Sequence, residues 1–265
     1  MLVDSHAHIG ARAFNKDRDR VMESARKAGV IAVVDVGSDI ESSETAIALT
    51  RQYDEVYAVV GFHPHNAARM TNGDIDKLAE LAGQPKVVAI GEVGLDFYRN
   101  LSPRHEQFEA FQRQLELAEE LGLPVVIHSR DAQEEVLDIL TDWARRSSLD
   151  GPLGVLHCFS GDAELAQRYI DMGFLISIAG PVTYRNSHAP EIARTVPLEK
   201  LVIETDCPYL TPVPYRGKRN EPSYVSLVAD KIGQIRGMPG DSVGEQTAEN
   251  ALRLFRLPHE LKGAL

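Results

Sequence analysis

The sequence predicts a (β/α)8 TIM barrel, the fold in which eight parallel strands alternate with helices and close into a cylinder. Three observations predict it. Short apolar runs recur along the whole chain, and most are continuous rather than alternating, as in strands that are covered on both faces. Helical patterns separate these runs. The chain has 265 residues, which is close to the usual barrel size of about 250.

Eight apolar runs are the expected strands. They are Leu2–Asp4, Val30–Val36, Val56–Val60, Val87–Ile90, Val125–Ile127, Gly154–Leu156, Phe174–Ile178 and Leu201–Ile203. Between the fourth and fifth runs, apolar residues follow helical spacing from Pro103, a start signal, to Gly122, a stop signal. A second helical stripe runs from Val136 to Trp143, and Gly29 ends a helix just before the second strand.

A doubly wound open sheet is the structural alternative to the barrel. It is disfavoured because no G-x-G-x-x-G pattern follows the first strand. No linker or low-complexity tract divides the chain. We therefore expect a single domain over residues 1–265.

Charge and cysteine content narrow the class of protein. The formal net charge of −11 argues against a protein that coats nucleic acid through bulk electrostatics, but it leaves room for a nuclease with a local basic patch. Two cysteines give no disulfide framework. The N-terminus has no signal-peptide pattern, and no stretch approaches the roughly 20 apolar residues that span a bilayer. We expect a cytoplasmic protein without membrane association or an obligate protein partner.

Two histidines follow the first expected strand. Because successive strand side chains alternate faces, His6 and His8 are expected to point to the same side. Such a pair can hold one divalent ion, although two histidines that cap a strand would produce the same pattern. Functional side chains of a barrel lie where strands end and the following loops begin, so the other strand ends decide between the two interpretations.

Residues that suit metal binding follow most of the other expected strands. All but three of the nine histidines lie at such positions. Taken singly, His128 or His157 is explained as well by a hydrogen-bonded core histidine, and Asp206 by a turn cap. Jointly, four imidazoles and two carboxylates match a site for two divalent ions, with zinc or manganese favoured over magnesium. The six expected ligands are His6, His8, Glu92, His128, His157 and Asp206.

The two cysteines adjoin two of these candidates. Cys158 follows His157 and Cys207 follows Asp206, so sulfur ligands have to be considered. In a strand, however, the neighbour of an inward-pointing residue points outward. We therefore expect both thiols to be packed away from the site.

Four further residues are candidates for contacting an anionic substrate. His63 and His65 follow the third strand, and six other ligands already fill two metal shells, so we expect both to donate to substrate oxygens; a turn shaped by Pro64 is the alternative. Arg130 and Arg219 suit phosphate oxygens, because a guanidinium donates in a planar fork. A solvated basic loop would explain the segment around Arg219 equally well.

Two tyrosines lie near the same basic segment. Tyr209 and Tyr215 could stack on a nucleotide base or pack against the rim of the barrel. The sequence leaves both possibilities open.

Taken together, these segments resemble the TatD family of metal-dependent hydrolases, within the amidohydrolase-like barrels. The motifs that carry the resemblance are D-S-H-A-H-I at 4–9, G-F-H-P-H at 61–65, G-E-V-G-L-D-F-Y at 91–98, L-P-V-V-I-H-S-R-D-A at 123–132, H-C-F-S-G at 157–161, E-T-D-C-P-Y-L-T-P at 204–212 and R-G-K-R-N-E-P at 216–222. One departure is Gly10, where the family usually has Asp or Asn. This change concerns the conformation of the first loop rather than metal binding.

The resemblance implies a pair of metal ions on the six ligands named above, with Glu92 bridging them. It also implies an activity, because family members are deoxyribonucleases and 3′-exonuclease activity is known for some. We therefore expect a divalent-metal-dependent hydrolase that cleaves phosphodiester bonds at the ends of nucleic acid strands, with DNA as the expected substrate. A metal-activated water would attack, with Glu92 and Asp206 as the catalytic residues and Asp206 taking or steering the proton of that water.

Two other functions are compatible with the same ligands. A dinuclear barrel can act on an amide, a lactone or a carboxylic ester, because it polarises a carbonyl group as readily as a phosphoryl group. More remotely, the chain could be a metal-binding barrel without catalysis.

Overall fold

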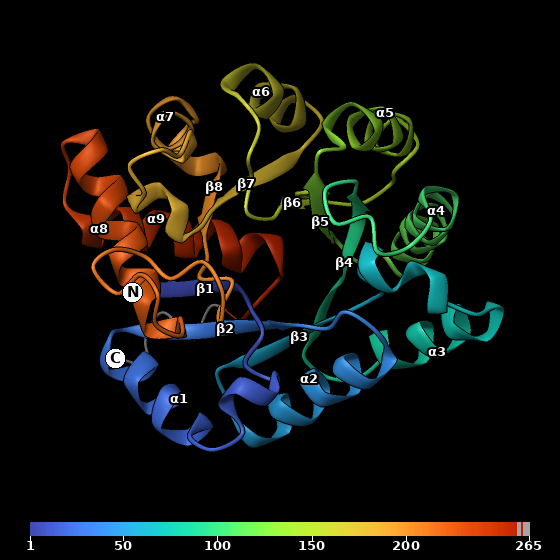
Figure 1. The fold of residues 1–265 in the computed structure, drawn as a ribbon, viewed down its shortest axis with the longest axis horizontal. Coiled ribbons are helices and arrows are strands. Elements are labelled where there is room, and N and C mark those ends of the chain that lie inside the picture. Colours follow the sequence, from blue (N-terminus) through green and yellow to red (C-terminus); the bar gives the residue numbers. More distant parts are fainter. Residues whose placement is uncertain (259–260, 262–265) are drawn as a thin grey trace.

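Eight parallel strands pair in chain order, each with the next, as the sequence predicts (Figure 1). The computed structural model describes residues 1–258 and 261, so the predicted domain range of 1–265 includes six residues that lie outside the described ones. The strands are β1 (Leu2–Ala7), β2 (Val30–Val36), β3 (Val56–Val60), β4 (Val87–Asp96), β5 (Val125–Arg130), β6 (Gly154–Leu156), β7 (Phe174–Ile178) and β8 (Leu201–Ile203). The (β/α)8 TIM barrel is thereby confirmed.

Helices follow the strands and surround the barrel (Figure 1). They are α1 (Arg18–Lys27), α2 (Ile40–Gln52), α3 (Asn72–Ala82), α4 (Arg104–Leu121), α5 (Gln133–Ala144), α6 (Ala163–Asp171), α7 (Ala189–Thr195), α8 (Val225–Arg236) and α9 (Gly240–Leu254). The predicted stop signal holds for α4, because Gly122 takes the left-handed conformation at its end, with φ of 67°.

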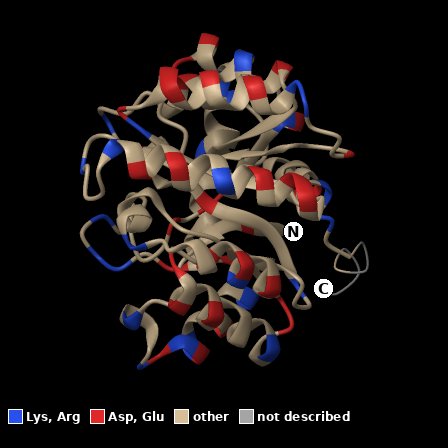
Figure 2. Ribbon diagram, turned by 90° about the vertical axis from the view of Figure 1, so that its right-hand side faces the viewer, with Lys and Arg blue, Asp and Glu red and all other residues tan. Residues whose placement is uncertain are grey.

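The last helix closes the barrel at the end where the strands begin. Strand residues that face the barrel interior, such as Val34 and Val126, form one buried cluster with Ala248, Leu252 and Phe255 of α9 or just beyond it. The N-terminus lies on this side of the molecule, at the right in Figure 2. The sequence patterns did not reveal α9. Because this end is plugged, the opposite end of the barrel is the one that can carry a site.

The first strand and the segment after the eighth are joined by hydrogen bonds. The buried carboxylate of Asp4 accepts from the backbone N–H and the hydroxyl of Thr205, at 2.8 and 2.6 Å. The N–H of Asp206 donates to the carbonyl oxygen of His6 at 2.9 Å. Residues about 200 positions apart in the sequence are thereby held side by side.

Three strands are longer than the sequence predicts. β1, β4 and β5 continue past their apolar runs, so His6, Glu92 and His128 lie within strands and not in the loops that follow. The expectations that His6, Glu92 and His128 follow their strands are therefore wrong. In the described part of the chain, no helix is both long and apolar enough to cross a membrane.

Candidate metal centre

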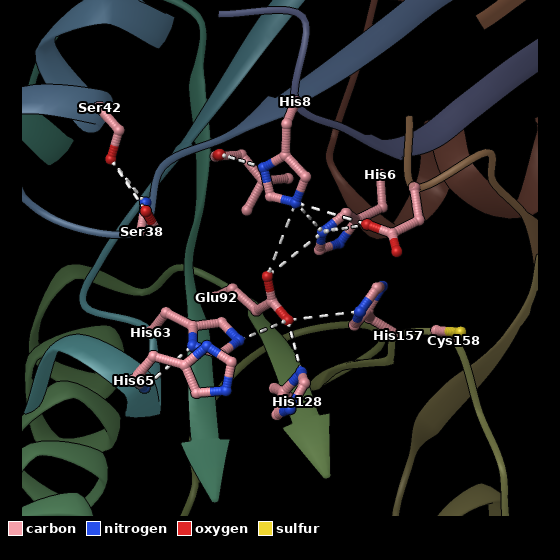
Figure 3. A network of polar contacts seen from close by, with 12 residues as sticks. His6, His8, Ser38, Ser42, His63, His65, Glu92, His128, His157 and Cys158 are labelled. Carbon is pink, nitrogen blue, oxygen red and sulfur yellow. Dashed lines mark hydrogen bonds and ion pairs between the residues drawn. The ribbon is translucent and has the colours of Figure 1, made fainter. Parts of the chain in front are cut away.

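Glu92 lies in the middle of a group of histidines at the carboxyl end of the barrel (Figure 3). Its side chain is buried, and its two oxygens face different partners. Oε2 lies 3.4 Å from His6 Nε2 and 4.0 Å from His8 Nε2. Oε1 lies 2.7 Å from His128 Nδ1 and 3.3 Å from His157 Nε2. One carboxylate thus separates two sets of nitrogen atoms.

An irregularity in β4 aims Glu92 at these rings. Ile90 pairs with Val125 and Val93 pairs with Ile127, so the strand carries one more residue than its neighbour between the two pairs. Such bulges commonly redirect a side chain next to a functional site. Two residues further on, Gly94 has φ of 144°, and a Cβ atom there would meet the carbonyl oxygen of His128 at 1.9 Å. Only glycine allows β4 and β5 to approach this closely.

Asp206 completes the first set of ligand atoms. Its Oδ1 lies 3.4 Å from His8 Nε2 and 4.0 Å from His6 Nε2, and the two histidine nitrogens are 3.4 Å apart. The expectation that His6 and His8 face the same side is confirmed. The backbone of Asp206 is left-handed, with φ of 56°, a conformation that Asp tolerates better than most residues.

The spacing of these atoms suits a divalent ion. Ligands about 2.0–2.1 Å from a tetrahedral zinc ion stand about 3.4 Å from one another, and the N···O and N···N separations around Glu92 Oε2 range from 3.4 to 4.0 Å. The electrostatics agree. Burial by itself lowers the pKa of His8, but Asp206 outweighs it and raises that pKa to about 9. The carboxylates therefore attract positive charge to this position.

Three of the rings are anchored through their outer nitrogen, which leaves the inner one for a ligand. His8 Nδ1 donates to the carbonyl oxygen of Val36 at 2.9 Å, so in the neutral ring Nε2 carries the lone pair that a metal needs. His128 Nε2 lies 3.1 Å from Asp96 Oδ2, and His157 Nδ1 lies 2.9 Å from Glu204 Oε1. Carboxylates in this position fix the ring orientation of metal-binding histidines.

Asp96 and Glu204 are functional candidates that the sequence analysis did not single out. Both carboxylates are buried. Burial raises the pKa of Asp96, but His128, the N–H of Arg99 and His65 outweigh it and hold that pKa below its usual range. Glu204 is also held by the hydroxyl of Ser177 at 2.6 Å. Both acids lie in the motifs quoted above. Their position, an acidic residue at the end of an apolar strand, is the sequence feature that could have identified them.

His63 and His65 join the site in different ways. His63 Nδ1 accepts the backbone N–H of His65, so the proton of a neutral ring is on Nε2, which lies 3.4 Å from Glu92 Oε1. Burial lowers the pKa of His63 to about 4, so the ring is neutral and donates. A protonated nitrogen donates a hydrogen bond and does not bind a metal, which favours substrate contact. His65 Nε2 instead lies 2.9 Å from Asp96 Oδ2.

The two expected arginines have different surroundings. Arg130 is exposed at the end of β5, its guanidinium stacks 3.9 Å from the ring centroid of Tyr98, and no carboxylate in the described part of the chain pairs with it. Arg219 is instead held by Asp17, at 2.9 and 2.7 Å, and by Glu221, at 3.0 Å. Its role as a phosphate contact stays a prediction, one that requires these carboxylates to release it.

The two thiols also differ. Cys207 is fully buried, as expected. Cys158 is only partly buried, because β6 ends at Leu156 and the alternation of a strand no longer applies. Its sulfur points away from Glu92 in Figure 3. Burial raises the pKa of the Cys158 thiol well above its usual value, which disfavours the thiolate that a metal would need.

Comparisons with known proteins identify the family of this chain. The family profile described as TatD related DNase matches residues 3–256. The chain belongs to the TatD family. It is therefore a metal-dependent hydrolase of that family, and its His, Asp and Glu clusters are able to bind metal.

Individual TatD relatives match along nearly their whole length. An uncharacterized metal-dependent hydrolase, YabD of Bacillus subtilis, is 43% identical over 97% of this chain and 100% of its own. A 3′-5′ ssDNA/RNA exonuclease, TatD of Salmonella typhimurium, is 39% identical over 97% of this chain and 99% of its own. The crystal structure of YjjV, a TatD homologue from Escherichia coli, superimposes with a TM-score of 0.89 at 28% identity, covering 97% and 98% of the two chains.

Gly10, the visible departure from the usual TatD pattern, lies against a buried acid on the neighbouring strand. Its N–H donates to Asp35 Oδ1 at 3.2 Å, so the first loop is held from β2. A Cβ atom at position 10 would stand 3.1 Å from both Asp35 Oδ2 and the methyl group of Thr45. The carboxylate of Asp35 thus lies beside the space that a side chain at position 10 would enter.

We expect Gly10→Asn to destabilise the protein by about 1–3 kcal/mol, because the new side chain crowds Asp35. The double variant Gly10→Asn/Asp35→Ala is expected to lose less stability than the two single changes add up to. Urea unfolding of the four proteins in the cycle measures the coupling. Strict additivity would mean that the two positions do not compete for space.

We expect Asp96→Asn to weaken metal binding by about 10- to 100-fold, because a partner that orients a metal-binding histidine is lost. Competition with a chelator measures the affinity, and unfolding in EDTA separates this effect from stability. The exposed Asp138 on α5 offers the matched control, Asp138→Asn. Unchanged affinity in Asp96→Asn would remove Asp96 from the orienting role.

Proposed function

We propose that this TatD-family hydrolase is a divalent-metal-dependent exonuclease that acts at the ends of nucleic acid strands. Its preferred substrate is DNA, and it removes nucleotides from the 3′ end. The observation that carries the metal part is the position of Glu92 between two sets of ligand atoms. His6, His8 and Asp206 would hold one ion with Glu92, and His128 and His157 the other. Divalent ions in such a site polarise a phosphoryl oxygen and lower the pKa of a water from about 15.7 to about 7.

The residues around that position suit attack on a phosphodiester. Asp206 faces the two histidines through Oδ1, so among the described residues its Oδ2 is the oxygen suited to take a proton from the attacking water. His63 donates from Nε2, and the guanidinium of Arg130, which pairs with no carboxylate among the described residues, lies at the rim. Both stabilise the charge that develops on the phosphate oxygens.

The substrate class also draws support from the relatives. Several are named as 3′-5′ ssDNA/RNA exonucleases, and the one from Salmonella typhimurium is 39% identical. Both cysteines are free, which is compatible with the predicted cytoplasmic location. An acidic chain that engages one strand end needs few phosphate contacts, so we expect a shallow dependence of binding on salt.

Metal-reconstituted protein assayed on single-stranded DNA tests the proposal. A label at the 3′ end is expected to be released first as a mononucleotide, while a label at the 5′ end stays on progressively shorter strands. Amides, lactones and carboxylic esters should be assayed beside the DNA. Turnover confined to those compounds would refute the nuclease assignment, and no turnover of any substrate would support a non-catalytic barrel.

A further inference from the structure

Large hydrophobic side chains are exposed almost only at the mouth of the barrel. Among the described residues, six are exposed, and all but Leu121 lie on the loop after β4 or the loop after β8. These five are Tyr98, Leu101, Tyr209, Val213 and Tyr215. Single exposed hydrophobic residues need no explanation, but their concentration around one opening marks a binding surface.

Three loop segments at the mouth are basic, although the molecule as a whole is acidic. Three segments there, 97–104, 179–188 and 207–220, carry six Lys or Arg residues and no Asp or Glu, whereas the whole chain carries a net charge of −11. Basic residues lie on several loops at the side away from the N-terminus, at the left in Figure 2. An anionic ligand is therefore attracted to these segments.

Aromatic rings and cations are combined at two places. Near the end of β5, Arg130 stacks on Tyr98, whose side chain is 59% exposed. Across the barrel, Arg216 stacks on Tyr184 at 3.9 Å, and the hydroxyl of Tyr184 donates to the carbonyl oxygen of Thr211 at 3.0 Å. This second place therefore joins the segment after β7, which carries Tyr184, to the loop after β8, which carries Arg216.

Tyr209 lies on the same loop as Arg216 and beside the metal centre. Its ring is 61% exposed and lies 6.2 Å from the ring of His8, centroid to centroid. Its backbone is held in place, because the Asn220 side chain donates to its carbonyl oxygen at 2.6 Å. An exposed ring beside a candidate ligand is placed to contact a molecule that enters the site.

The strand order places the two aromatic positions on opposite sides of the mouth. Tyr98 follows β4, and Tyr209 follows β8, four strands away in a barrel of eight. Glu92 and its histidines lie between them. An extended polymeric ligand that contacts both rings therefore passes over the metal centre.

We propose that Tyr98 with Arg130 and Tyr209 with Arg216 are two base-and-phosphate subsites that hold a single-stranded nucleic acid across the mouth, over the metal centre. The proposal rests on the proposed nuclease function and names the residues that select its substrate. Stacking on exposed rings needs unpaired bases, whereas arginine at both places suits the backbone phosphates. The track thus selects single strands over duplexes, and it tolerates any base because every base has a stacking face.

Binding of fluorescein-labelled oligothymidylate with a phosphorothioate backbone, measured by anisotropy, tests the track without turnover. We expect Tyr98→Leu and Tyr209→Leu each to weaken binding about tenfold, since each removes one stacked base. We expect Arg130→Gln to act in the same direction. Leu121→Ala and Arg145→Gln, which change an exposed leucine and an exposed arginine away from the mouth, are the controls. A duplex of equal length is expected to bind more weakly than the single strand.

Steady-state kinetics of the same variants distinguish a loss of substrate binding from a general structural defect. On unmodified oligothymidylate, the tyrosine variants are expected to raise KM more than they lower kcat. The small diester methyl 4-nitrophenyl phosphate has no base to stack, so its turnover is expected to fall less than that of the oligonucleotide.

The failures of the two proposals are distinguishable. If the wild-type protein cleaves strand ends but both tyrosine variants bind like wild type, or the controls fall equally, the track is refuted and the nuclease assignment stands. Equal binding of duplex and single strand also refutes the track. If the wild-type protein neither binds nor cleaves oligothymidylate, the nuclease assignment itself is refuted.

Discussion

Asp206→Asn is expected to lower kcat by about 10²- to 10⁴-fold, the range that a positioned general base contributes. Asparagine keeps the shape and the Oδ1 atom that faces His6 and His8, but it cannot take a proton from water. Much of the bound metal should therefore remain. Steady-state turnover on labelled single-stranded DNA, with metal content measured on the same sample, checks both parts.

The matched control is Asp138→Asn, which makes the same chemical change on the exposed face of α5. It is expected to leave turnover unchanged. Wild-type turnover in Asp206→Asn would show that the assigned role is wrong. Complete loss of metal would show that Asp206 serves mainly to hold the ion.

Glu92→Gln is expected to have the larger effect on metal binding. Glu92 is the carboxylate whose two oxygens face both sets of nitrogens, and burial leaves it no solvent to replace those partners. Loss of an orienting residue behind a ligand costs about 10- to 100-fold in affinity, so loss of the shared ligand should cost more than about 100-fold. Chelator competition and metal content per chain measure this loss.

The two variants are expected to differ in kind. Asp206→Asn should be inactive with metal bound, whereas Glu92→Gln should be inactive because metal is missing. Added excess metal is therefore expected to restore some turnover to Glu92→Gln and none to Asp206→Asn. If Glu92→Gln retains full metal content at equal affinity, Glu92 is not a shared ligand.

The strand positions were predictable because they depend on a local property. Val56–Val60 and Phe174–Ile178 are continuous apolar runs, and burial on both faces of a parallel strand requires such runs. The ends of β1, β4 and β5 were not predictable in this way, because polar residues there stay in the sheet. The bulge before Val93 depends on pairing with β5, which the sequence of β4 alone does not contain.

The convergence of the six candidate ligands followed from the barrel, because its strand ends meet at one mouth. The supporting contacts did not follow. Asp96 contacts Nε2 of His128, and which of the two ring nitrogens faces Asp96 depends on how the ring is turned in the folded protein. Arg219 is held by Asp17, 202 positions earlier in the chain, and nothing in the basic segment indicates that partner. Such contacts depend on packing between elements that are distant in sequence.

That Glu92 stands between two divalent ions is tested most directly by anomalous diffraction from crystals equilibrated with zinc or manganese. Two anomalous peaks are expected beside Glu92. One should lie among His6, His8 and Asp206, and the other should lie next to His128 and His157. A single peak at the histidine pair, or peaks that do not contact Glu92, would contradict the two-ion centre on which the proposed hydrolysis depends.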